Sequence, residues 1–545
     1  MQGRLRFIER RILWIGFTGL LVHGLACDSP RSPPNEFPEL PPRHREGPPV
    51  VVIGIDGAEW KVIRRLWEQG RLPNLRRLAE EGTASDLITD YGASPVIWTT
   101  MATGHAPEVH GITDFAVATE TGTVPVSSSL RRVPALWNIA SRARLRTAVL
   151  GWWASWPAEE VAGVVVSDRA HLPVDRIVHP PSYLEGFLVQ RDLASRSYPG
   201  LGGVPTIEDA WMEDSAARDR IMAHEARRFV GLGFDLFLVY FRSVDVASHR
   251  YWKTFEPQHY PSVTREEIEA SGGVIPAVYE ATDQAIGDIL AAAPPEANVF
   301  VVSDHGFFAG PEEHFVNLNA ERLLEHLGLL VRDGQSVDFA HSVAYPVESP
   351  NHSRTKKFRI SVAGREPGGR VEARGVGAAV RDLSRALQDV TYANGKPVFR
   401  IRRAAREMAA DLVAEVKVED PTLEIRAGAA SYRDVVLYID RISGTHDRRH
   451  HGILIARGPD LVPGARPGEM TIRDIAPTIL YALGLPVAED FPGKPKLELF
   501  REGFQTLHPL RAVPSWGTME TWGVESSPVD SRILDELRAL GYIEP

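Results

Sequence analysis

Seven side chains in this sequence have the types and settings that metal-assisted chemistry requires. Six are carboxylates or imidazoles that stand after apolar runs or close to them: Asp56, Asp245, His249, Asp304, His305 and His446. The seventh is the hydroxyl of Ser94. Imidazole and carboxylate suit zinc, and carboxylate also suits manganese or magnesium. Six such ligands make two sites of three, and two metals ~4 Å apart can clamp the attacking and leaving oxygens of a phosphoryl displacement.

Ser94 is the candidate nucleophile. Gly92 permits a tight backbone approach and Pro95 suits the first turn of a helix, so we expect Ser94 at or near the N-cap of a helix running towards Thr103. A serine hydroxyl bound to a metal can lose its proton at neutral pH, which activates a nucleophile that has no neighbouring base. A plain N-cap serine is the commoner use of this pattern, so the argument depends on the ligands as well.

Two of the acids follow apolar runs that lack alternation. The run Val50–Ile55 ends in Asp56, and the run at 298–302 is followed by Asp304 and His305. Such runs are typical of strands buried on both faces of a parallel sheet. Because ligands bind beyond the carboxyl ends of such strands, we expect these acids at the mouth of one site.

Asp245 and His249 follow a third apolar run, at 235–241. Residues four apart share one face of a helix, or they can converge from a loop. A surface ion pair is the commoner explanation for such a pair taken alone. Its position after a predicted strand favours the site.

The remaining pattern alternates strands with helices. Further strands are expected at 147–152, 164–167, 434–439 and 452–456, and helices at 60–81 with a break at Pro73, 213–232, 275–293, 376–389, 472–483 and 530–540. The region 179–219 is interpreted as loop-rich, and 310–430 as an inserted cap. The order of elements predicts an α/β fold with a mostly parallel central sheet and helices on both faces.

Composition sets limits on function. The 545 residues are 43% hydrophobic and carry a net charge of −10, which suits a globular protein and argues against binding of nucleic-acid polymers. Cys27 is the only cysteine. Intrachain disulfides, Cys-based zinc sites and a catalytic cysteine in the body of the protein are therefore excluded.

The N-terminus predicts export. A basic segment, a short apolar segment and Ala26-Cys27 form a signal peptide over 1–27 that resembles a bacterial lipoprotein cleavage site, although Gly24 departs from the usual aliphatic residue. The alternative is a simple signal peptide or uncleaved anchor with an incidental cysteine. A Pro-rich linker is expected at 28–48, a catalytic domain at 49–500 and a tail with a helix at 501–545. The predicted location is periplasmic or cell-surface, with lipid attachment at Cys27 as the membrane anchor.

Taken together, the motifs resemble the alkaline phosphatase superfamily, in particular its type I phosphodiesterase/nucleotide pyrophosphatase-like branch and related bacterial phosphohydrolases. The matching stretches are Gly54-Ile55-Asp56-Gly57, Ser94-Pro95-Val96-Ile97-Trp98, Pro107-Glu108-Val109-His110-Gly111-Ile112, Asp245-x-x-x-His249, Ser303-Asp304-His305-Gly306 and Gly444-Thr445-His446. The resemblance covers about 50–490 and implies an alkaline phosphatase-like fold with an inserted cap.

The resemblance also implies roles. Ser94 matches the nucleophile that becomes phosphorylated and contacts a metal. Asp245, His249 and His446 match one metal site, which activates the hydrolytic water. Asp56, Asp304 and His305 match the other, which contacts the nucleophile. Two divalent metals are implied as cofactors, Zn²⁺ in the first instance and Mn²⁺ as the alternative, and the substrate is a phosphate ester.

Departures from the family pattern leave the substrate open. Phe115 stands where nucleotide pyrophosphatases usually place an asparagine that holds a phosphoryl oxygen, and no arginine lies near Ser94 in the sequence. A neutral pocket favours diesters over monoesters. The leading hypothesis is therefore an exported two-metal phosphodiesterase. Transfer of a phosphoryl head group to an envelope lipid or glycan, or a catalytically inactive envelope-binding protein on the same fold, are the alternatives.

Overall fold

The computed structural model describes residues 37–119, 122–197, 210–333, 336–347, 355–404, 410–417, 424–447, 449–521, 523–540 and 542. The expected signal peptide, Cys27 and the first part of the expected linker lie outside these residues. The described part of the linker, 37–48, contains neither helix nor strand. Within the described chain, every helix is too short or too polar to cross a membrane.

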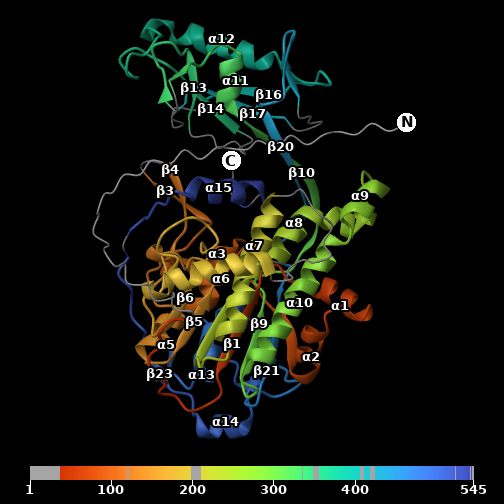
Figure 1. Ribbon diagram of the computed structural model, residues 1–545, viewed down its shortest axis with the longest axis vertical. Helices are drawn as coiled ribbons and strands as arrows, with labels where there is room; N and C mark the ends of the chain where they lie inside the picture. The colour runs from red at the N-terminus through yellow and green to blue at the C-terminus, as the bar shows by residue number, and fades with distance from the viewer. Residues whose placement is uncertain are drawn as a thin grey trace, which may run out of the picture.

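The central sheet has eight strands in the order β2-β21-β9-β1-β8-β5-β6-β7 (Figure 1). They are β1 (Val50–Ile55), β2 (Thr83–Leu87), β5 (Thr147–Leu150), β6 (Gly163–Val166), β7 (Val178–His179), β8 (Leu236–Phe241), β9 (Asn298–Val302) and β21 (Gly452–Arg457). The five central strands from β9 to β6 run parallel. The outer strands pair antiparallel: β21 pairs with β9 and with the edge strand β2, and the edge strand β7 pairs with β6. The mostly parallel sheet predicted from the sequence is confirmed.

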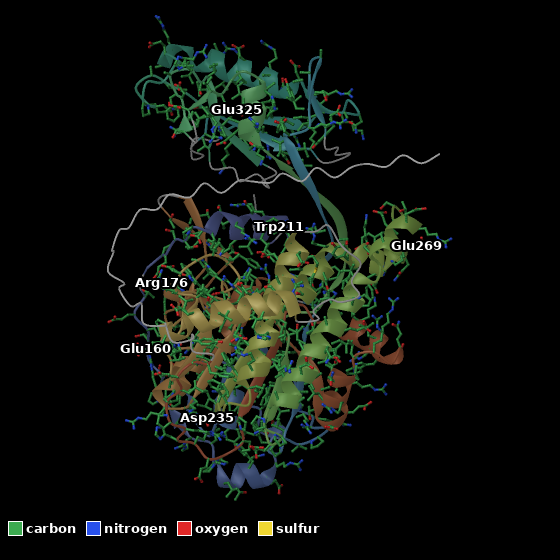
Figure 2. All side chains as sticks on the ribbon, in the orientation of Figure 1. Glu160, Arg176, Trp211, Asp235, Glu269 and Glu325 are labelled. Carbon is green, nitrogen blue, oxygen red and sulfur yellow. The ribbon has the colours of Figure 1, made fainter. Side chains whose placement is uncertain are left out.

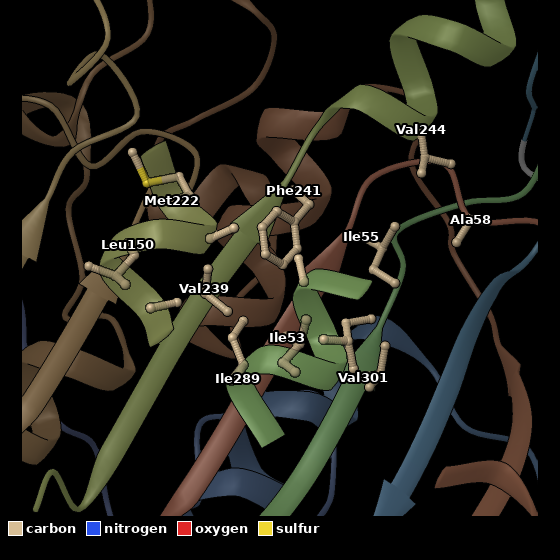
Figure 3. Packing of buried hydrophobic residues seen from close by; sticks show 14 of the residues in the cluster. Ile53, Ile55, Ala58, Leu150, Met222, Val239, Phe241, Val244, Ile289 and Val301 are labelled. Atoms are coloured by element: carbon tan, nitrogen blue, oxygen red, sulfur yellow. The ribbon is translucent and has the colours of Figure 1, made fainter. Parts of the chain in front are cut away.

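β1 lies between β8 and β9 and is buried on both faces. Its side chains alternate between two apolar clusters, with Ile53 in one and Val52 in the other. Figure 3 shows the first cluster, where Ile53 packs with Val239 and Val301 of the flanking strands. Because both faces are covered, the run needs no polar alternation, which is why its sequence is continuously apolar.

Helices cover both faces of the sheet, as predicted. On one face lie α1 (Trp60–Glu68), α2 (Pro73–Glu81), α6 (Leu184–Ser197), α7 (Ala210–Phe229), α8 (Ser243–Phe255) and α10 (Val274–Ala292). On the other lie α3 (Ser94–Thr103), α5 (Leu136–Arg142), α13 (Ile475–Ala482) and α14 (Glu502–Leu507). Smaller elements are α4 (Pro107–His110), α9 (Arg265–Ser271), β3 (Ala116–Thr119), β4 (Gly122–Pro125), β22 (Val487–Ala488) and β23 (Ala512–Val513).

The cap stands on two long antiparallel strands, β10 (Phe308–Leu318) and β20 (Val436–Thr445) (Figure 1). Its other elements are α11 (Ala320–His326), β11 (Arg332–Asp333), β12 (Ser336–Val337), β13 (Ala344–Pro346), β14 (Thr355–Ile360), α12 (Val376–Gln388), β15 (Val390–Tyr392), β16 (Phe399–Arg403), β17 (Leu412–Val416), β18 (Ile425–Ala427) and β19 (Ala430–Tyr432). An apolar cluster that runs from Val316 to Val436 forms a core of its own.

The tail ends in α15 (Asp530–Ala539), which crosses the upper end of the body below the cap in Figure 1. This is the end of the sheet at which the parallel strands finish. The opposite end carries Asp235, labelled low in Figure 2, which pairs with Arg43 at 2.9 Å. Among the described residues, the acids that cluster with histidines lie at the upper end.

One expectation for this body was wrong. The region 179–219 was predicted to be loop-rich, but it contains the 14-residue helix α6 and the start of α7. Pro180 and Pro181 precede α6, and these local turn signals hide its helical spacing. Phe187 and Ala194, seven residues apart and both buried, show the face that packs on the body.

Candidate active site

The fold brings all seven candidate residues to one place. Asp56 directly follows β1, Asp304 and His305 follow the neighbouring β9, and β8 leads into α8 with Asp245 and His249. His446 comes directly after β20, and Ser94 is the first residue of α3. β9, β1 and β8 are adjacent and parallel in the central sheet, so their carboxyl ends meet.

One group consists of Asp56, Asp304 and His305, whose ligand atoms lie within 4.8 Å of one another. Nε2 of His305 is 3.5 Å from Oδ1 of Asp56 and 3.2 Å from Oδ2 of Asp304. All three side chains are buried. This is the grouping that the resemblance implied.

The second group is Asp245, His305 and His446, again within 4.8 Å. The rings of His305 and His446 stack with centroids 3.6 Å apart. His249 adjoins this group, because its Nε2 lies 3.5 Å from Oδ1 of Asp245. The structure thus places His305 in both groups, whereas the resemblance assigned it to one only.

In each carboxylate of the first group, one oxygen accepts hydrogen bonds from the surrounding fold. Oδ2 of Asp56 accepts hydrogen bonds from the hydroxyl of Tyr240 and, at 3.3 Å, from Nε1 of Trp153. Oδ1 of Asp304 accepts from the backbone N–H of Gly57 at 3.1 Å. The other oxygens face the cluster, and Oδ2 of Asp304 is buried without a hydrogen-bond partner among the described residues.

The imidazoles are oriented in a similar way. Nδ1 of His249 donates to the carbonyl of Gly444 at 3.0 Å, and Nδ1 of His305 donates to the carbonyl of Gly306 at 3.1 Å. Since a carbonyl can only accept, the proton sits on Nδ1 and the lone pair of Nε2 faces the cluster. This tautomer is the one that a metal-binding histidine uses.

Burial sets the charges of these groups. It lowers the pKa of His249 to about 3 and that of His446 well below the ordinary value, so both rings are neutral at pH 7. Burial, and then the charge of Asp56, raises the pKa of Asp245 and Asp304 well above the usual range. Crowded carboxylates and neutral imidazoles with unpartnered atoms fit divalent cations, which would balance the negative charge.

Ser94 faces the first group. Its Oγ lies 3.5 Å from Oδ1 of Asp56 and 3.4 Å from Nε2 of His305. The helix N-cap is Ala93, one residue earlier. The N–H groups of Val96 and Ile97 both bond the carbonyl of Ala93, so they are already engaged and offer little to a bound anion.

Sequence reasoning missed several side chains around the ligands. Tyr240 and Trp153 hold Asp56 from the sheet and from a loop, and Tyr542 of the tail donates to Asp245. A tyrosine inside the apolar run of β8 was a usable signal for Tyr240, because a buried hydroxyl needs a partner. Phe115, the position that departs from the family pattern, stacks on Tyr542 with centroids 4.6 Å apart.

Arg242 was also missed. It precedes α8, and its charge acts on both Asp245 and Asp56. Its Nη1 pairs with Oε1 of Glu536 in α15 at 2.7 Å, and the guanidinium lies 5.2 Å from the ring centroid of Trp153. The positive charge near the site is therefore already matched by a buried carboxylate.

This sheet, with metal-type ligands at its strand ends and a cap on long arms, is an alkaline phosphatase-like fold. The chain belongs to the family described as type I phosphodiesterase/nucleotide pyrophosphatase, whose model matches residues 50–436. This is a family of metal-dependent phosphoric ester hydrolases. No match was found among curated proteins.

Solved structures with a similar arrangement are distant. Human ectonucleotide pyrophosphatase/phosphodiesterase 5 is 13% identical with a TM-score of 0.39, covering 83% of this chain and 100% of that one. Phosphonoacetate hydrolase from Sinorhizobium meliloti 1021, in complex with phosphonoformate, is 15% identical with a TM-score of 0.39, covering 82% and 98%.

Proposed function

We propose that this protein is a two-metal phosphodiesterase that cleaves phosphate esters through a phospho-Ser94 intermediate. The observation that carries the proposal is the buried hydroxyl of Ser94, within 3.5 Å of Asp56 and His305. Family membership supports hydrolysis of phosphoric esters. Two divalent metals held by the six ligands would neutralise phosphoryl charge and lower the pKa of a nearby hydroxyl.

The chain's own residues then have defined tasks. Oγ of Ser94 forms a bond to phosphorus while the ester P–O bond breaks, and the leaving alcohol gains the proton that Ser94 loses. Water next attacks phosphorus, the bond to Oγ breaks, and Ser94 regains a proton. Asp56 and His305 keep the hydroxyl oriented, and the closely packed side chains limit competing water.

A diester is the favoured substrate. The charge of Arg242 is matched by that of Glu536 at 2.7 Å, which reduces the attraction that this guanidinium offers to a doubly charged monoester. A diester carries one negative charge fewer than a monoester and loses less hydration free energy on entering such a site. Transfer of the phosphoryl group to an alcohol acceptor is the second candidate, and product analysis with an added alcohol distinguishes transfer from hydrolysis.

The variant Ser94→Ala tests the covalent route. We expect the full-length variant to lose at least about a thousandfold in rate on bis(p-nitrophenyl) phosphate with added Zn²⁺ or Mn²⁺, because the nucleophile is gone. The variant Ser336→Ala, at an exposed serine in the cap, is the matched control and keeps the wild-type rate. An unchanged rate in Ser94→Ala would rule out the phospho-serine intermediate.

Metal content separates an enzyme from an inactive binding protein on the same fold. About two zinc or manganese ions per chain support the enzyme. A stable, metal-free protein supports the binding protein.

We also propose that the protein is exported and anchored through a lipid on Cys27. The basic and apolar N-terminal segment that ends in the chain's only cysteine supports this proposal. We expect the wild type in the membrane fraction and Cys27→Ala in the soluble fraction. A wild type that fractionates as soluble contradicts the anchor.

A further inference from the structure

The carboxylates of the site follow one rule in their hydrogen bonding. In Asp56 and Asp304, one oxygen accepts from a donor supplied by the fold and the other faces the ligand cluster. A carboxylate fixed in this way presents one oxygen to a metal in a single orientation. The donors for these two residues come from the sheet and the loops around it.

Among the described residues, the donor that brings Asp245 under the same rule comes from the C-terminal tail. Oδ2 of Asp245 accepts a hydrogen bond from the hydroxyl of Tyr542. Its Oδ1 is buried without a hydrogen-bond partner among the described residues and lies 3.5 Å from Nε2 of His249 and 3.9 Å from Nε2 of His305. Tyr542 therefore does for Asp245 what Tyr240 does for Asp56.

We propose that Tyr542 is a positioning residue for Asp245 and that the C-terminal segment is part of the active site. This inference rests on the proposed function and deepens it, since it assigns a role to a segment beyond the family match at 50–436. The hydroxyl orients Oδ1 of Asp245 towards the second ligand group. The metal held there would bind more weakly without it.

Several contacts fix the ring of Tyr542. It stacks on Phe115 with an interplanar angle of 6° and meets the ring of His249 edge to face at 5.0 Å. Its backbone N–H donates to the carbonyl of Leu537 in α15 at 2.8 Å. Phe115, which lacks a polar group of its own, thus provides the surface on which a polar group from the tail rests.

Buried contacts hold α15 itself. Leu537 and Leu540 are buried in the apolar clusters of the body. Asp530 pairs with Arg169 at 2.9 Å, and Glu536 pairs with Arg242, the residue before α8. Arg242 directly precedes α8, the helix that carries Asp245. The tail therefore contacts the start of this helix as well as the carboxylate that Tyr542 orients.

A competing explanation is that Tyr542 blocks the site and must leave before substrate binds. The two explanations predict effects of opposite sign. Removal of a positioning hydroxyl weakens metal binding and slows the reaction, whereas removal of a blocking group raises kcat/KM. The stacking on Phe115 and the hydrogen bond that leaves Oδ1 of Asp245 free favour positioning.

The test uses full-length Tyr542→Phe, which keeps the stacked ring and removes only the hydroxyl. Zinc titration of the metal-free protein should show an affinity about 10–100-fold weaker for one of the two ions and unchanged for the other. Activity at limiting zinc should fall through kcat and recover at higher zinc concentration, which a purely structural defect would not do. The control Tyr392→Phe removes a hydroxyl that donates to the backbone carbonyl of Lys417 in the cap and should change neither value.

A double-mutant cycle completes the test. In an Asp245→Asn background, Tyr542→Phe should have no further effect on zinc affinity, because the hydroxyl acts through that carboxylate. Unchanged zinc affinity in Tyr542→Phe, or a rise in its kcat/KM, overturns the proposal. If the wild type binds two ions but cleaves no phosphate ester, the proposed function fails, while the titration still decides the role of Tyr542.

Discussion

The two halves of the site are built from different parts of the molecule. Asp56 and Asp304 follow two adjacent strands at the centre of the sheet, and their hydrogen-bond donors belong to the same body. Asp245, His249 and His446 come from the helix α8 and from the end of β20, the strand that returns from the cap. Their partners include the tail. One half is thus part of the core, and the other depends on peripheral elements.

This difference determines which parts of the molecule can alter the geometry of each half. Burial on both faces of the sheet fixes the first half, so its geometry changes only if the core does. β20, α15 and Tyr542 connect the second half to the cap and to the tail. His305 belongs to both groups, so a displacement of its ring in one half also alters the ligand geometry of the other half.

The largest effect is expected for Asp304→Asn, which is to be compared with Asp245→Asn. Oδ2 of Asp304 lies 3.2 Å from Nε2 of His305, which both groups share. Loss of this carboxylate should therefore weaken the binding of both ions. Activity should fall by more than the about 10–100-fold that is typical when a residue hydrogen-bonded to a metal ligand is removed. Asp245→Asn should retain about one ion per chain, held by the first group. Metal analysis of both purified variants measures the difference, and equal metal loss in the two would contradict separate halves.

An intermediate effect is expected from Gly444→Ala. A Cβ at this position would lie 2.1 Å from the carbonyl oxygen of Ser248, so β20 would have to move away from α8. The carbonyl of Gly444 holds His249, and His446 lies two residues further on. We expect a loss of about 10–100-fold in rate, with the first ion retained.

Gly503→Ala in α14 is the matched control for Gly444→Ala, because open space surrounds that glycine. It should keep the wild-type rate. A full rate in Gly444→Ala would show that the second half tolerates displacement of β20.

The first half was the more predictable from the sequence. Asp56 and Asp304 follow runs whose continuous apolarity identifies buried parallel strands, and Gly92 and Pro95 indicate the helix start that Ser94 occupies. These are local signals, within a few residues of the functional side chain. The mostly parallel sheet was predictable for the same reason.

The second half was predictable only in its ligands. No local pattern connects Tyr542 with Asp245, 297 residues earlier, or shows that Phe115 supports the tyrosine ring. The sharing of His305 likewise follows from how β9, α8 and β20 pack, which the order of elements does not fix. Contacts between distant segments decide these features, so they require the folded structure.

The smallest expected effect is a pH dependence of metal affinity. Burial raises the pKa of Asp245 and Asp304, so these carboxyl groups retain protons in the metal-free protein at pH values where exposed carboxylates are ionised. A metal must displace those protons, and affinity should rise with pH by up to about tenfold per unit for each proton released. His249, with a pKa of about 3, contributes no proton near neutral pH. Calorimetric zinc titrations in buffers of different ionisation enthalpy measure the release, which should decrease in Asp304→Asn and persist in Tyr392→Phe. Zinc binding without proton release at pH 7 would mean that both carboxylates are already ionised in the metal-free site.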